Sequence, residues 1–278
     1  MSLVGFTLLV GAGSLGAGFL GSLTGLGGGA VLVPLLALGF GVDMRYAIGA
    51  SLISVIATSS GAAAAYVKEG YTNLRVGMFL EIATTCGALG GAFLAARVPS
   101  SWIAVLFGIV LIHSAYLSSR TPTPDAGDGT SDPWAKRLRL DGSYPSTSGR
   151  RSYHARGVPA GFGLMAVAGA LSGLLGIGSG AIKVLAMDRV MRLPFKVSTT
   201  TSNFMIGVTA AASAGVYLNR GFIDPGLAMP VMLGVLLGSM AGARVLARAR
   251  TRLLRIVFSL VILLLGLEMI YSGLTGRL

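Results

Sequence analysis

The chain has 278 residues, of which 53% are hydrophobic and only 12% are charged, and its formal net charge is +12. Soluble domains carry about 25% charged residues, so this composition excludes an ordinary soluble protein and favours a membrane protein. The basic residues lie in short segments between apolar runs, as they do on the cytoplasmic side of membrane proteins. We therefore expect no nucleic acid among the partners.

Apolar runs of about 20 residues, the length needed to cross a bilayer as a helix, follow one another along the chain. We predict eight of them, at 3–22, 46–66, 75–96, 101–119, 157–175, 197–218, 226–247 and 253–273. Two shorter apolar runs, at 29–40 and 180–191, each follow a glycine-rich stretch. The expected fold class is an all-α membrane protein with about ten membrane segments. Whether the short runs cross fully or re-enter is left open.

The sequence also repeats itself with a shift of 151 residues. Residues 23–33 align with residues 174–184, so that three glycines of each stretch coincide, namely Gly25, Gly27 and Gly29 with Gly176, Gly178 and Gly180. Five crossings per half is an odd number, so the two halves would be inverted relative to each other. We predict a first membrane repeat at 1–119, a linker loop at 120–156 and a second membrane repeat at 157–278. Re-entrant short segments would instead make the repeats parallel.

The basic residues predict the orientation of these segments. With ten crossings, seventeen of the 22 basic residues fall on one side, which the positive-inside rule places in the cytoplasm. Both termini would then be outside, and the central loop would be cytoplasmic. Within this loop, residues 134–140 resemble an interfacial segment, and Asp141-Gly142 is a turn signal. A small hairpin and a disordered loop both remain open.

The two glycine-rich stretches are the main candidates for a binding site. Short, interrupted apolar segments at matching places in two halves are the best sequence indication of a transporter's site, and a helix that begins there favours an anion. The alternative is that these glycines only allow close helix packing. The candidate residues are Gly25, Gly27, Gly28 and Gly29 in the first stretch, and Gly176, Gly178, Ser179 and Gly180 in the second.

Polar side chains in the apolar segments are further candidates. Ser51, Thr201, Ser202 and Asn203 could bind an oxyanion, although hydroxyls also form ordinary bonds between membrane helices. Lys183 stands three positions after Gly180 and could neutralise a substrate or pair with another residue, or extend to the interface. Glu81, His113 and Glu268 are candidates for proton coupling, since each is ionisable inside a predicted span.

Several other classes of function lack their residues in this sequence. We find no cluster with metal-ligand spacing, no nucleophile–base pair and no complete nucleotide-binding motif, and so expect no cofactor, no metal and no enzyme. Gly87 and Gly91, and likewise Gly238 and Gly242, form small-xxx-small pairs that predict helix packing. Cys86 is the single cysteine and lies inside a span, so no disulfide is expected.

The stretches GSLTGLGGGAVLVPLL (21–36), SGLLGIGSGAIKVLAM (172–187) and MDRVMRLPFKVSTTTSNFMIGVTAAASAGVYLNRG (187–221) resemble the sulfite exporter TauE/SafE family of membrane proteins. The resemblance implies secondary transport of small sulfur-containing oxyanions or organosulfonates across the bacterial plasma membrane, generally outward. It highlights the glycines of both stretches together with Lys183, Thr201 and Ser202. This chain has Ser179 where that family usually has glycine, and Leu185 where it often has proline.

These observations together predict a transporter that holds a small anion between its two glycine-rich stretches and works by alternating access. The expected location is the bacterial inner membrane, with the lipid bilayer and the small anion as partners, and a homodimer is left open. An anion channel on the same scaffold is one alternative. A membrane-bound accessory subunit of a sulfur-metabolism system is another.

Overall fold

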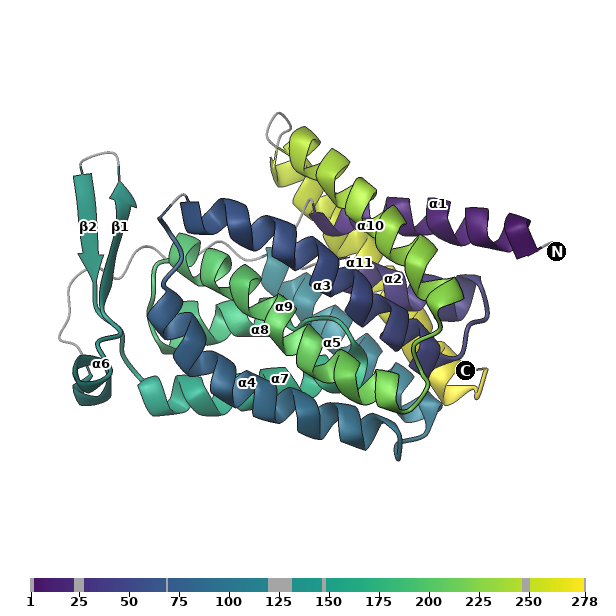
Figure 1. Cartoon of the computed structure of the whole chain (residues 1–278), viewed down its shortest axis with the longest axis horizontal. Helices are drawn as coiled ribbons and strands as arrows, with labels where there is room; N and C mark the ends of the chain where they lie inside the picture. Colours follow the sequence, from purple (N-terminus) through teal and green to yellow (C-terminus); the bar gives the residue numbers. More distant parts are fainter. Residues whose placement is uncertain are drawn as a thin grey trace.

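The computed structural model describes residues 3–22, 28–68, 70–119, 132–146, 149–246 and 251–277. Figure 1 shows a bundle of helices that lie lengthwise beside one another. The helices are α1 (Leu3–Ser22), α2 (Gly29–Pro34), α3 (Met44–Lys68), α4 (Leu74–Ala95), α5 (Ser100–Ser119), α6 (Pro133–Arg137), α7 (Val158–Leu175), α8 (Gly180–Leu185), α9 (Phe195–Asn219), α10 (Pro225–Leu246) and α11 (Thr251–Leu274). Two π-helical turns, η1 (Leu35–Gly39) and η2 (Ala186–Val190), continue α2 and α8.

The predicted helical membrane protein is confirmed in this general form. Within the described residues, three helices are long and apolar enough to cross a membrane: 74–95, 158–175 and 225–242. Shorter apolar helices cover 5–21, 29–39, 100–116 and 259–274. Large apolar side chains point outward, for example Ile82 on α4 and Leu264 on α11, as expected where lipid replaces water.

The second half reproduces the element boundaries of the first. From α2 to α4 and from α8 to α10, every helix begins and ends exactly 151 residues after its counterpart, and the two π-helical turns do the same. The turns before α4 and α10 also match, since Gly70 has φ +73° and Gly221 has φ +74°. A shared local sequence has therefore given the same local structure twice.

Glycines bring helices of opposite halves into backbone contact. A Cβ atom on Gly87 or Gly91 of α4 would lie 2.0 Å from a carbonyl oxygen of α7, and one on Gly238 of α10 would lie 2.0 Å from a carbonyl oxygen of α1. The packing role predicted for these three glycines is therefore confirmed. In both pairs the contacting residue numbers rise together, so α4 runs parallel to α7 and α1 runs parallel to α10.

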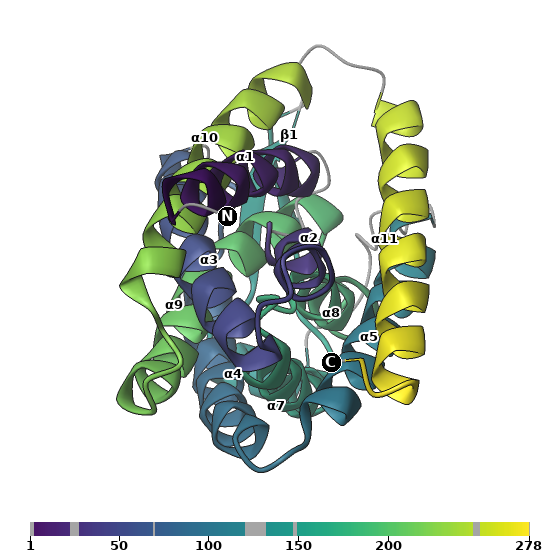
Figure 2. The same ribbon diagram turned by 90° about the vertical axis from the view of Figure 1, so that its right-hand side faces the viewer.

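The pairing of α5 with α11 differs, because these are equivalent helices of the two halves. Gly108 on α5 faces Gly266 and Ile270, whereas Gly273 near the end of α11 faces Ser101 at the start of α5. The residue numbers therefore change in opposite directions along the two helices, which are antiparallel. Figure 2 shows this pair beside the rest of the bundle, with α2 and α8 near the middle.

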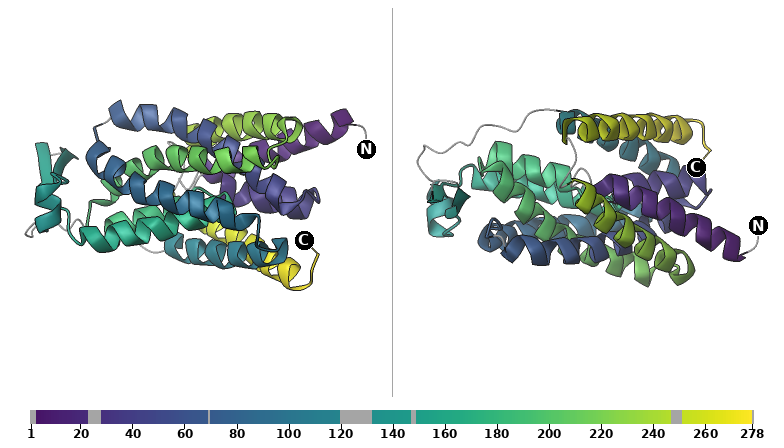
Figure 3. Two further views of the ribbon diagram at one scale, coloured as in Figure 1. Left: turned by 60° about the horizontal axis from the view of Figure 1, so that its bottom comes forward. Right: turned by 90° about the horizontal axis from the view of Figure 1, so that it is seen from above.

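The central segment is ordered where the structure describes it, and it adds strands to an otherwise helical fold. Strands β1 (Gly142–Ser146) and β2 (Gly149–Tyr153) form an antiparallel hairpin, and Gly142, expected in a turn, instead begins β1. The Asn73 amide ties the hairpin to the start of α4 by donating to the Tyr153 hydroxyl at 2.7 Å and to the Leu140 carbonyl at 3.1 Å. Figure 3 shows the hairpin at the end of the bundle opposite the termini.

Candidate functional site

The two glycine-rich stretches meet at Ser51 of α3. The Ser51 hydroxyl donates a hydrogen bond to the Gly176 carbonyl at 2.8 Å. A Cβ atom on Gly29, the first residue of α2, would lie 2.7 Å from the Ser51 Oγ and 2.9 Å from the Gly176 carbonyl oxygen. Gly28 is buried just before α2, while Gly25 and Gly27 fall outside the described residues. The first stretch therefore contacts the second at Gly29, where a larger residue would have to displace neighbouring atoms.

The second stretch turns by left-handed backbone. Gly176 and Gly178 have φ of +68° and +70°, and Ser179 has φ +46°. Side chains other than glycine rarely adopt such angles, so Ser179 has a backbone conformation that favours glycine. The Ser179 side chain is buried, and its Oγ has no hydrogen-bond partner within the described part of the chain.

Lys183, Thr209 and Glu81 form what we call the buried ion cluster. Lys183 of α8 is fully buried and donates from Nζ to the Thr209 Oγ1 at 2.5 Å. Thr209 of α9 donates in turn to the Glu81 Oε1 at 2.7 Å, and Thr85 donates to the same oxygen at 3.1 Å. Glu81 of α4 is 8% exposed, and its Oε2 has no hydrogen-bond partner among the described residues. A single hydroxyl thus links two opposite charges from the two halves.

The polar run of α9 divides between two places. The Ser202 hydroxyl donates to the Gly180 carbonyl at 3.3 Å and so joins α9 to the start of α8. The Thr201 hydroxyl instead accepts from the backbone N–H of Asn73 at 3.1 Å, which places it at the start of α4. Asn203 is partly exposed. Within the described residues, Ser202 is the one of these three predicted residues that forms a hydrogen bond with the second glycine-rich stretch.

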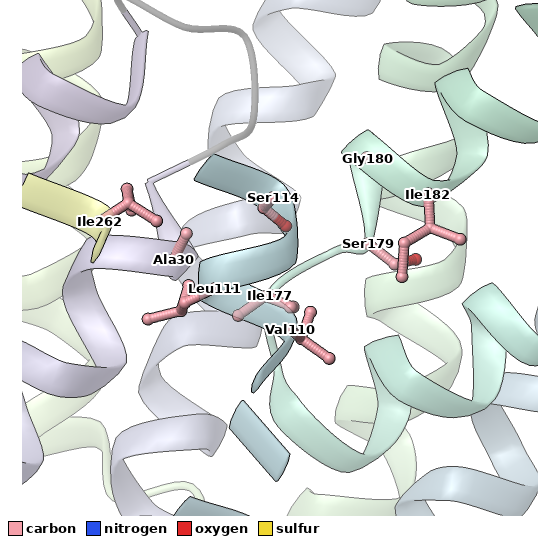
Figure 4. Close-up of a pocket in the computed structure, with 9 residues that line it drawn as sticks. All are labelled: Ala30, Val110, Leu111, Ser114, Ile177, Ser179, Gly180, Ile182 and Ile262. Atoms are coloured by element: carbon pink, nitrogen blue, oxygen red, sulfur yellow. The ribbon is translucent and has the colours of Figure 1, made fainter. Parts of the chain in front are cut away.

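A cavity lies beside the start of α8 (Figure 4). It encloses about 340 Å³ including its opening, and side chains of α2, α5, α8 and α11 line it. The lining is mainly apolar, and Ser114 and Ser179 supply its hydroxyls. Gly180 also lines this space, whereas Lys183 does not. The predicted residues of the second stretch therefore face two different environments.

The remaining ionisable candidates lie elsewhere. His113 on α5 and Glu268 on α11 are exposed. Glu268 accepts a hydrogen bond from Ser272, one turn along its own helix. No group of three or more metal-ligating side chains occurs among the described residues.

Sequence reasoning considered Glu81 and Lys183 separately and missed their connection through Thr209. Charged residues inside apolar segments are costly unless they are paired with an opposite charge, so the presence of both in this sequence could have predicted that Glu81 and Lys183 lie close together.

Comparison with known proteins gives a consistent result. The family model described as "Sulfite exporter TauE/SafE" matches residues 9–269. The "Probable membrane transporter protein YunE" of Bacillus subtilis is 30% identical over 96% of this chain and 98% of its own length. The "Probable membrane transporter protein MJ0441" of Methanocaldococcus jannaschii is 26% identical over 91% of each chain, and a "Probable membrane transporter protein" of Xylella fastidiosa is 24% identical over 98% of each. No solved structure matches this chain.

Proposed function

This chain belongs to the sulfite exporter TauE/SafE family of membrane transporters, and we propose that it exports a small sulfur-containing anion of the sulfite, thiosulfate or organosulfonate class by alternating access. The observation that carries the proposal is the buried ion cluster. A fully buried lysine in the last turn of the short helix α8 offers a positive charge to an anion, beside a hydroxyl that can donate a hydrogen bond.

We further propose that the halves are inverted repeats, which is the architecture that alternating access uses in many carriers. The antiparallel course of α5 and α11 supports this, because a twofold axis in the membrane plane reverses the direction of equivalent helices. Two cation–aromatic contacts also support it. Arg45 stacks over Phe222 and Lys196 stacks over Tyr71. The two contacts are equivalent, because Lys196 lies 151 residues after Arg45 and Phe222 lies 151 residues after Tyr71.

The proposed orientation has both termini outside and the central loop in the cytoplasm. Its support is the excess of basic residues in the segments expected on the cytoplasmic side. The hairpin and the ends of α1 and α11 lie at opposite ends of the bundle, as this orientation requires (Figure 3). Labelling of single cysteines introduced in the hairpin and after α11, in intact cells and in inverted vesicles, tests it.

Flux measurements in proteoliposomes test the transport proposal. We expect saturable flux of sulfite, thiosulfate or methanesulfonate, accelerated by the same anion on the opposite side. A Lys183→Met variant should lose roughly tenfold or more in apparent affinity, because a hydrogen bond to a charged group contributes about 1.5–3 kcal/mol. Lys136→Met, a change of the same kind at an exposed position of α6, is the control and should leave the flux intact.

Other outcomes separate the alternatives. Flux that neither saturates nor responds to anion on the opposite side would indicate a channel. An absence of flux for all three anions would refute the transport proposal, and recovery of the protein with soluble partners would then support an accessory subunit. Wild-type affinity in Lys183→Met would remove Lys183 from the site.

A further inference from the structure

The buried ion cluster leaves one carboxylate oxygen unsatisfied. Glu81 Oε1 accepts two hydrogen bonds, from Thr209 and Thr85, whereas Oε2 has no partner among the described residues although it is buried. An ionised carboxylate buried in this way costs several kcal/mol unless a nearby positive charge compensates it. Lys183 supplies that charge through the Thr209 hydroxyl.

No other charged side chain takes over the role of Lys183 in the described structure. Helix α7, which packs on α4, contains no ionisable residue. On α9, Lys196 stacks over a tyrosine ring near the hairpin, and the Tyr217 hydroxyl donates to carbonyls at the end of α7. The ionised form of Glu81 therefore depends on the single positive charge of Lys183.

An anion that binds Lys183 would remove this compensation. The bound anion would take the hydrogen bonds that Lys183 and Thr209 can donate, and it would place a second negative charge beside Glu81. A like charge close to a carboxyl group favours the neutral form of that group. Glu81 would then take a proton from the aqueous phase from which the anion enters, so that the anion and the proton come from the same side.

We propose that the anion and the Glu81 carboxylate compete for Lys183 and Thr209, so that each anion travels together with a proton held on Glu81. In the empty carrier, Lys183 and ionised Glu81 sum to zero charge. In the loaded carrier, Lys183, a monovalent anion and protonated Glu81 again sum to zero. Both forms thus avoid the cost of exposing net charge to the membrane interior. This inference rests on the proposed transport function and assigns its coupling ion.

Proteoliposomes that enclose a pH-sensitive dye test the coupling. Methanesulfonate is the probe, because it is monovalent and does not exchange protons near neutral pH, whereas thiosulfate is divalent and sulfite exchanges protons. With the membrane potential clamped, an inward gradient of methanesulfonate should acidify the lumen of wild-type vesicles, with about one proton per anion, as the charge balance requires. Glu81→Gln should still exchange anion for anion but should no longer move protons. Glu268→Gln, the same change at an exposed position of α11, should behave as the wild type does.

The outcomes separate this inference from the function on which it rests. Saturable wild-type flux without acidification, or acidification that persists in Glu81→Gln, would overturn the coupling and leave transport standing. An absence of any wild-type flux would refute transport itself. If Glu81→Gln carries no anion in either assay, thermal stabilisation by the anion decides. If methanesulfonate still stabilises Glu81→Gln and this stabilisation no longer depends on pH, the proposed competition is supported. If methanesulfonate no longer stabilises Glu81→Gln, although the variant alone is as stable as the wild type, the proposed competition is overturned.

Discussion

The contact between the two glycine-rich stretches gives the sharpest prediction, which is that Gly29→Ala destabilises the protein. Gly29 lies in regular helix, so alanine meets no backbone restriction there. The added methyl group would instead lie 2.7 Å from the Ser51 Oγ, 2.9 Å from the Gly176 carbonyl oxygen and 3.3 Å from the Val55 Cγ2. The first and third atoms belong to side chains that can rotate, but the carbonyl oxygen is held by left-handed backbone.

The magnitude follows from three contributions, of which two destabilise the variant and one stabilises it. Overpacking of a close contact costs about 1–3 kcal/mol, and alanine is better than glycine within a helix by about 0.5–1 kcal/mol. Rotation of Ser51 to make room would also break its hydrogen bond to Gly176, at a cost of about 1 kcal/mol. We therefore expect a net destabilisation of about 1–3 kcal/mol. Gly163→Ala on α7 meets no atom within 4 Å and should be neutral or stabilising.

Thermal unfolding in detergent measures the difference, and the fluorescence of Trp102 and Trp134 reports it. Gly29→Ala should melt below the wild type, and Gly163→Ala at or above it. Equal melting of the wild type and Gly29→Ala would refute the close approach of the two stretches. An equal loss in both variants would show that any added methyl group is harmful and would remove the special role of Gly29.

Three further predictions concern hydrogen bonds. Thr209→Val removes the hydroxyl between two buried charges and should destabilise the protein by about 1–3 kcal/mol in thermal unfolding. Thr84→Val is the control and should destabilise it less, because the Thr84 hydroxyl bonds only to carbonyls of its own helix. Asn73→Ala removes the cap of α4, worth about 1 kcal/mol, and both bonds to the central segment, so limited proteolysis should cut the region of the hairpin faster. Burial raises the pKa of Tyr153 above that of a tyrosine in the unfolded chain, so the unfolded chain ionises first as the pH rises above about 10, and the hairpin should lose stability there. Tyr153→Phe should abolish this pH dependence in the same proteolysis assay.

The helices could be predicted closely because apolar length and glycine position both act locally. The short runs expected at 29–40 and 180–191 appear as helical stretches over 29–39 and 180–190. The central segment could not be predicted in the same way. Its hairpin depends on contacts with distant residues, such as the bond between Asn73 and Tyr153, and no local pattern in the sequence records them.

The buried ion cluster escaped prediction for a related reason. The repeat tells which positions are equivalent, at a spacing of 151 residues, but it does not tell which positions touch. Asn73 contacts Thr201, and Glu81 contacts Thr209, both at a spacing of 128 residues, because α4 packs parallel to α9 of the other half. A spacing of this kind arises only from tertiary packing, so the partner of Glu81 could be found only in the structure.

The buried ion cluster has no charged counterpart at the equivalent positions of the other half. Counted back or forward by 151 residues, the counterparts of Lys183 and Glu81 are Leu32 and Met232, which carry no charge. The counterpart of Thr209 is Thr58, whose hydroxyl donates to carbonyls of its own helix. Among the described residues, these two sets of equivalent positions therefore contain one charged cluster rather than two. If this cluster binds the anion and is exposed alternately to each side, as proposed above, it would hold one anion in each cycle, whereas two equivalent clusters could hold two.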